Sequence, residues 1–171
     1  TSTCFLPEEK LGIAVFTNTD ANYLYEALKY QIIESYLNLP YRNFSNIFYG
    51  FYEDGNNEAK NFYESEMNIV KQNNKTGLSL NEYSGKYFNT AYGNIEIKNE
   101  NGKLVIHFSR HPFLLGVLYP RGGNSFLCEY SHPGWGMKVI DFSVENGKSV
   151  SVKIKVNDNI DFMEYVFNKV E

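Results

Sequence analysis

The second half of the chain shows a period-two pattern of apolar and polar positions. In the segments 104–108 and 150–156, every second residue is apolar and most of the residues between are polar or charged. Such alternation directs side chains to opposite faces of a strand and predicts a sheet with one buried face. We expect eight strands, at Glu82–Phe88, Asn94–Lys98, Lys103–Ser109, Phe113–Tyr119, Ser125–Tyr130, Met137–Val144, Ser149–Val156 and Phe162–Lys169.

Short turns separate these predicted strands. Asn101-Gly102 and Asn146-Gly147 each stand between a glutamate and a lysine, and Asn-Gly accommodates the positive φ that a type I′ hairpin turn requires. Further turns are predicted at Arg121–Asn124 and Asn157–Asn159. Connections this short make neighbouring strands antiparallel. We therefore predict an eight-stranded up-and-down β-barrel, whose closure removes the free edges.

The first half begins with a continuous apolar run, Leu11–Phe16, which predicts a strand buried on both faces. An apolar stripe then predicts a helix from Ala21 to Leu37, ended by Pro40. One isolated strand cannot satisfy its backbone or cover both of its faces. Residues 1–40 therefore look like the end of a larger domain. We expect the strand to pair with a second copy, or residues 1–40 to pack against the helix that follows.

The region between these two parts is predicted to be helical from Phe44 to about Asn74, with an interruption at Asp54–Asn57. Three glutamates of this region, Glu58, Glu64 and Glu66, indicate a solvated helix face. The predicted fold class is α+β. Its segments are the terminal strand and helix of a truncated domain at 1–40, a helical linker at 41–78, and the barrel at 79–171.

Composition argues against two classes of partner. The net charge is −4 and the sequence has no clustered basic segment, so we expect no nucleic-acid partner. No apolar run approaches the roughly 18 residues of a membrane-spanning helix.

Cys4 and Cys128 are too few for a disulfide framework and are expected to be unpaired, partly buried thiols. The residues from Thr1 onward resemble a cut end, so the lack of a signal peptide says little about the compartment.

The sequence lacks the motifs of a self-contained enzyme. It contains neither Ser-x-x-Lys nor Gly-x-Ser-x-Gly, and without a nucleophile the run Lys75–Gly77 is interpreted as a chance match to a penicillin-binding signature. His107, His111 and His132 lack the spacing of a metal site and are expected at the surface, with His107 outside the barrel. We therefore predict no cofactor, no metal and no enzymatic activity for this chain.

The loop Ser131–Gly136 is the most unusual of the sequence because it holds the only tryptophan, Trp135. One interpretation has Trp135 cap a ligand cavity at the barrel mouth together with Phe126 and Tyr130. The other has Trp135 plug the end of the barrel. Small eight-stranded barrels are either filled by side chains or hold one small ligand, and the many large aromatic residues favour a filled barrel.

Two parts of the chain are similar to one group of proteins. The residues Leu11–Asn18, with a helix that ends at Tyr36–Pro40, resemble the last strand and C-terminal helix of serine β-lactamase-like, penicillin-binding-protein-like hydrolases. The segments Leu80–Tyr87, Tyr92–Ile97 and Asn101–Leu104 resemble the lipocalin-like C-terminal domain, a domain of unknown function, that is often fused to those hydrolases.

This resemblance implies a function. The catalytic motifs of the hydrolases all precede the strand that holds Gly12, and they would lie upstream of Thr1. The chain is thus expected to be a non-catalytic accessory domain of a periplasmic or secreted bacterial serine hydrolase, aiding assembly or substrate access. Its expected partners are the upstream catalytic domain of the same protein and, through assembly, further copies in a homo-oligomer. The alternative is a lipocalin-like binder of a small apolar ligand.

Overall fold

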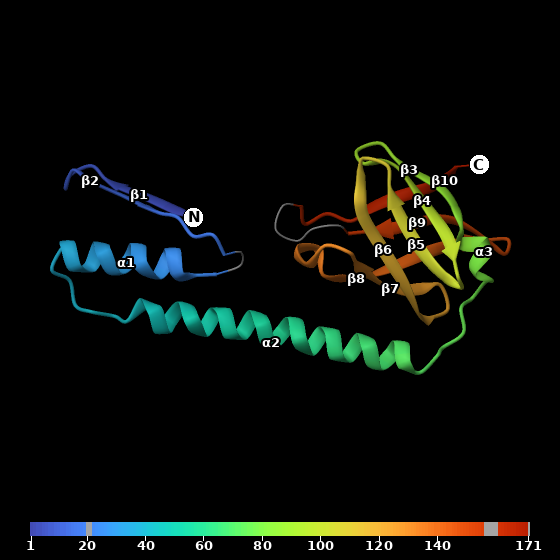
Figure 1. The fold of residues 1–171 in the computed structure, drawn as a ribbon, viewed down its shortest axis with the longest axis horizontal. Helices are drawn as coiled ribbons and strands as arrows, with labels where there is room; N and C mark the ends of the chain where they lie inside the picture. Colours follow the sequence, from blue (N-terminus) through green and yellow to red (C-terminus); the bar gives the residue numbers. More distant parts are fainter. Residues whose placement is uncertain (20–21, 156–160, 171) are drawn as a thin grey trace. The chain divides into compact units, whose positions relative to one another are not determined.

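The chain folds into two units, residues Thr1–Phe62 and Tyr63–Glu171. The computed structural model describes residues 1–19, 22–155 and 161–170 (Figure 1). The predicted helix start at Ala21, the strand residue Val156 and the turn Asn157–Asn159 lie outside the described residues.

The first unit contains a β-hairpin covered by a helix. Strands β1 (Ser2–Leu6) and β2 (Leu11–Val15) pair antiparallel, with Cys4 opposite Ile13. Helix α1 (Leu24–Tyr36) contacts both strands, and Ile13 is buried.

In this chain the strand at Leu11–Phe16, predicted to be buried on both faces, is covered on only one. Gly12 and Ala14 are exposed, and the side chain of Phe16 is 75% exposed. The strand is also not isolated, since β1 pairs along one of its edges. The sequence pattern missed β1 because its five residues are too short for a clear alternation.

Helix α2 (Phe44–Lys71) begins in the first unit and ends in the second. Within the first unit, the ring of Tyr30 on α1 stacks on Phe44 at 5.0 Å and on Phe48 at 6.0 Å. This contact confirms that residues 1–40 pack against the following helix. The predicted interruption at Asp54–Asn57 is wrong, because α2 is continuous there. Gly and Asn each cost a helix interior only about 0.5–1 kcal/mol, and no proline is present to break it.

The second unit is a closed antiparallel barrel with the strand order β10-β3-β4-β5-β6-β7-β8-β9 (Figure 1). This confirms the predicted α+β fold with an eight-stranded up-and-down barrel. Its strands are β3 Gly85–Asn89, β4 Gly93–Glu100, β5 Lys103–Phe108, β6 His111–Gly122, β7 Ser125–Tyr130, β8 Met137–Glu145, β9 Lys148–Ile154 and β10 Tyr165–Val170.

The two predicted Asn-Gly turns have the expected backbone conformation. Asn101 and Asn146 have φ of 52° and 49°, as the predicted Asn-Gly hairpins require. The start of the first barrel strand differs, because Leu80–Tyr83 forms a short helix, α3, and β3 begins only at Gly85.

Side chains pack the barrel interior. Alternate residues from all eight strands, with Tyr83 of α3, form one buried cluster. Packing is tight at Gly116, where an added Cβ would lie 2.8 Å from the Cys128 Sγ atom. The prediction that aromatic and aliphatic side chains fill the barrel is therefore confirmed for these residues.

Candidate functional site

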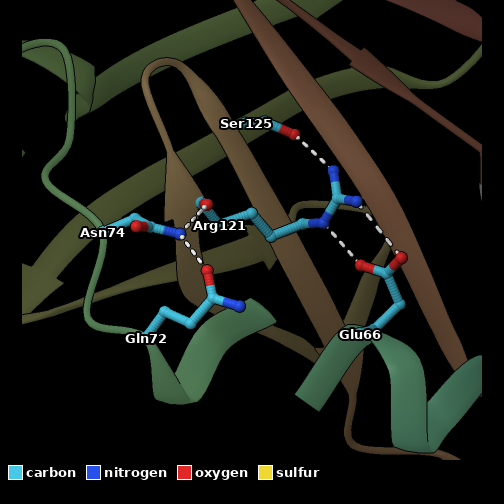
Figure 2. Close-up of polar contacts among 5 residues, drawn as sticks. All are labelled: Glu66, Gln72, Asn74, Arg121 and Ser125. Atoms are coloured by element: carbon cyan, nitrogen blue, oxygen red, sulfur yellow. Dashed lines mark hydrogen bonds and ion pairs between the residues drawn. The ribbon is translucent and has the colours of Figure 1, made fainter. Parts of the chain in front are cut away.

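An ion pair joins the end of α2 to the barrel within the second unit. Glu66 of α2 accepts two hydrogen bonds from the Arg121 guanidinium on β6, with 3.1 Å between Nη2 and Oε1 (Figure 2). The Arg121 guanidinium also donates to the Ser125 hydroxyl at 2.9 Å. The backbone carbonyl of Arg121 accepts a hydrogen bond from the side-chain Nδ2 of Asn74 at 3.0 Å. These contacts fix the last turns of α2 to the barrel.

The prediction that Glu66 lies on a solvated helix face is wrong. Glu66 is only 8% exposed. The helical pattern gives no local sign of this burial, because the partner Arg121 lies 55 residues further along the chain. A two-bond contact between a guanidinium and a carboxylate fixes direction as well as distance, so the pair orients α2 on the barrel.

The residues Lys75–Gly77 also bind the barrel. The Gly77 amide donates to the Gly123 carbonyl at 2.7 Å, and the Gly123 amide donates to the Lys75 carbonyl at 3.0 Å. The run that resembles a catalytic signature thus forms a backbone tether onto the β6–β7 turn.

A buried polar network closes the barrel end at α3. The Tyr83 hydroxyl donates to Asn124 Oδ1 at 2.6 Å, and the Tyr87 hydroxyl donates to the Tyr83 carbonyl at 2.6 Å. Burial raises the pKa of Tyr87 to about 12, so its hydroxyl remains a neutral donor at ordinary pH. Phe126 belongs to this closed end, with its ring 5.1 Å from Tyr83 and 5.4 Å from Phe142.

The other end of the barrel holds Tyr130 and Trp135. Their rings lie 5.9 Å apart. Phe126 lies four residues from Tyr130 along β7, or about 13 Å at strand spacing. The structure therefore brings together two of the three predicted ligand-binding residues and places Phe126 near the opposite end.

The loop that carries Trp135 is anchored to β6. The Leu115 amide donates to the Ser131 hydroxyl at 3.0 Å, and the Ser131 amide donates to the Leu115 carbonyl at 2.9 Å. The short helix η1 (Pro133–Trp135) follows, closed by a hydrogen bond from the Trp135 amide to the His132 carbonyl at 3.0 Å. These bonds set Trp135 beside His111, with 6.2 Å between the ring centroids.

A hollow of about 250 Å³ lies between this loop and the start of β6. We call it the mouth groove. Its lining residues are Arg110, His111, Pro112, Phe113, Leu114, His132 and Trp135. It combines one guanidinium, two imidazoles and two aromatic faces, and no carboxylate belongs to this set.

The sequence interpretation named Trp135 but missed Arg110 and Phe113. Their proximity to the loop follows from the β6–β7 register, in which Gly116 lies opposite Tyr130. The predicted strands Phe113–Tyr119 and Ser125–Tyr130 carried the needed signal. Extending their pairing past the strand end would have placed residues 110–114 beside the loop.

The remaining candidate groups have structural surroundings. His107 lies half-buried on β5, with its Nε2 atom 2.7 Å from the Glu100 carboxylate. In the described part of the chain, no group of three or more potential ligands is placed to hold a metal ion. Both cysteines are free thiols, and burial raises the pKa of Cys128 to about 12, which makes it a poor nucleophile.

Comparison with known families identifies the barrel. The family described as Domain of unknown function (DUF3471) matches residues 70–169. The chain belongs to the DUF3471 family. The match begins in the last turn of α2 and extends through β10, so the DUF3471 domain contains the tether, α3 and all eight barrel strands. No curated protein and no solved structure matches the chain. None of the described helices combines the length and apolar character needed to cross a membrane.

Proposed function

We propose that this chain is the non-catalytic accessory region of a serine hydrolase of the β-lactamase-like, penicillin-binding-protein-like type. In this proposal the DUF3471 barrel aids assembly of the enzyme or access of substrate to it. The hydrolase is periplasmic or secreted, and its catalytic residues lie upstream of Thr1.

The outer face of the β1–β2 hairpin is the main support for this proposal. Thr3, Phe5, Gly12 and Ala14 form that face, opposite the face covered by α1, and all four are exposed. The side chain of Phe5 is 67% exposed. Two-stranded sheets are marginal in water, and a face of small and apolar residues is what a further layer of a domain covers.

A second apolar surface lies within the same unit. A hollow of about 220 Å³ between the start of α1 and the first half of α2 is lined largely by aromatic residues, among them Tyr23, Phe48 and Tyr52. Exposed apolar hollows of this kind occur at interaction sites. The resemblance of Leu11–Asn18 to the last strand of the hydrolases supplies the identity of the domain that we expect to cover the unit.

The interior of the barrel favours an accessory role over the binding of a ligand inside the barrel. Its interior positions are occupied by the buried cluster that includes Tyr87, Phe126 and Phe167. The Glu66–Arg121 pair joins the last turns of α2 to this filled barrel. A filled barrel that is fixed to a helix suits a structural role beside another domain better than the binding of a ligand inside the barrel.

The test uses the natural gene product that contains this chain. It is purified from its source and treated with a fluorescent fluorophosphonate, which labels activated serines. We expect the label on a serine N-terminal to Thr1, within a Ser-x-x-Lys motif, and none on the 171-residue chain treated in parallel. A natural product without an activated serine, or a label within the 171 residues, would overturn the proposal.

The accessory role is tested in the same product by the substitution Arg121→Met. We expect a changed oligomeric mass or a changed kcat/KM while the activated serine is still labelled. Glu164→Gln, which removes an exposed ion pair on the barrel, is the matched control and should change neither. An Arg121→Met enzyme that equals the natural one in both measurements would contradict the accessory role of the contact between α2 and the barrel.

A further inference from the structure

We propose that the mouth groove binds a small organic carboxylate that carries an aromatic or flat apolar body. This inference goes beyond the accessory role and does not depend on it. The groove lies entirely within the DUF3471 domain, between residues 110–114 and the loop that carries Trp135.

Backbone hydrogen bonds hold the two walls of the groove in place. Ser131 bonds to Leu115 in both directions and donates from its hydroxyl to the Phe113 carbonyl at 3.3 Å. Behind the loop, the Tyr130 amide donates to the Gly136 carbonyl at 3.1 Å. A site whose walls are already ordered loses little entropy when a ligand enters.

The polar groups of the groove are suited to an anion. Arg110 is permanently charged, and its Nη1 donates to the neutral Ala91 carbonyl at 3.3 Å. A guanidinium has five N–H donors in a planar fork, which matches the two oxygens of a carboxylate. Among the described lining residues none is a carboxylate, so Arg110 gives this part of the groove a positive charge on a chain whose net charge is −4.

His132 adds a directed donor. Its Nδ1 atom accepts a hydrogen bond from the Gly134 amide at 3.1 Å. A neutral imidazole whose Nδ1 accepts must carry its proton on Nε2. The Nε2–H group is therefore a second donor among the lining residues, in addition to the guanidinium of Arg110.

The aromatic residues indicate the second half of the ligand. Phe113 is 96% exposed on β6 and so contributes almost nothing to the barrel core. Trp135 is half-buried, and its ring makes tilted contacts with the rings of Tyr130 and His111. Two aromatic side chains beside a cation suit a ligand with a charged head and a flat apolar body. A hollow of about 250 Å³ has room for a fragment-sized molecule.

The test uses phenylacetate as the probe and the fluorescence of Trp135 as the readout. Trp135 is the only tryptophan of the chain, so a change in its emission reports the groove directly. Phenylacetamide, which has the same shape without the charge, and inorganic phosphate, which has charge without the apolar body, are titrated in parallel. We expect saturable binding of phenylacetate and at least about tenfold weaker binding of both comparison molecules.

Variants locate the site. Arg110→Gln should weaken phenylacetate binding by about tenfold. Phe113→Ala should weaken it by about threefold or more, and its high exposure leaves the fold intact. Lys86→Gln and Phe88→Ala replace an exposed cation and a partly exposed phenylalanine on β3 that do not line the groove, and should bind like the parent chain.

Several results would overturn the proposal. These are the absence of saturable binding, equal affinity for phenylacetamide or phosphate, and unchanged affinity in both Arg110→Gln and Phe113→Ala. Backbone amide chemical shifts of the intact chain give an independent check. Shifts caused by phenylacetate should map to residues 110–114 and 131–136, and a different location would also contradict the assignment.

Discussion

The Glu66–Arg121 pair gives the sharpest test of how α2 is held to the barrel. Arg121→Met removes the cation that faces a carboxylate whose side chain is 10% exposed. Loss of one partner of a buried ion pair costs about 3–5 kcal/mol, and because the Arg121 side chain is 21% exposed we expect the lower end, about 3 kcal/mol. Glu66→Gln should cost less, about 1–1.5 kcal/mol, since the amide oxygen can still accept a hydrogen bond and Ser125 still binds the guanidinium.

Urea unfolding monitored by Trp135 fluorescence measures these costs. With a slope of about 1.5 kcal/mol per molar, a loss of about 3 kcal/mol lowers the midpoint by about 2 M. The double variant should show a coupling free energy of about 1–3 kcal/mol between the two sites. Glu164→Gln is the control, because the exposed Lys153–Glu164 pair at 3.0 Å should contribute no more than about 0.5 kcal/mol.

The result that refutes this reasoning is specific. If Arg121→Met unfolds at the same urea concentration as Glu164→Gln, the pair does not hold α2 to the barrel. A coupling free energy near zero would show that the two side chains act independently despite their contact. Hydrogen exchange of the amides in residues 66–74 gives a local check, since these amides should lose protection in Arg121→Met before the barrel strands do.

Three further predictions concern the barrel. Burial and a pKa of about 12 should leave the Cys128 thiol unreactive in the folded chain. Ellman's reagent should therefore titrate only the partly exposed Cys4 in the folded chain, and should titrate Cys128 as well once urea unfolds it. Gly116→Ala should cost about 1–3 kcal/mol, because its Cβ would lie 2.8 Å from the Cys128 Sγ atom, and Cys128→Ala in the same chain should recover part of that loss in a urea titration. A hydrogen bond from the Tyr165 hydroxyl lowers the pKa of Asp161 in the folded chain. The Asp161 carboxylate therefore stabilises the fold above its unfolded pKa of about 4. This contribution is lost as the pH falls through the lower pKa of the folded state. The difference in urea midpoint between the parent chain and Asp161→Asn should therefore shrink on acidification, and a constant difference would contradict that sign.

Much of the barrel could be predicted from local patterns alone. The alternation at 104–108 and 150–156 and the two Asn-Gly turns depend on the pleat of a strand and the φ of single residues, which act within a few positions. Antiparallel pairing then follows from the short connections. Two strand starts were predicted three residues too early: β3 begins at Gly85 rather than Glu82, because Leu80–Tyr83 forms a turn of helix, and β10 begins at Tyr165 rather than Phe162.

Other features had no local signal. The strand β1 is too short for its alternation to be distinguished from a loop. Helix α2 continues through Asp54–Asn57 because the small propensity cost of these residues is spread over a long helix.

The sequence by itself determined the class of the protein: an antiparallel barrel preceded by a strand and helices, with a composition that favoured a filled interior. Hydrophobic periodicity and turn chemistry carry that information because each acts through the neighbours of a residue along the chain. Only the tertiary structure decided which distant side chains meet. It buried Glu66 against Arg121, separated Phe126 from Trp135, and brought Arg110 and Phe113 beside the tryptophan loop. Such contacts depend on barrel closure and strand register, which no short window of sequence contains.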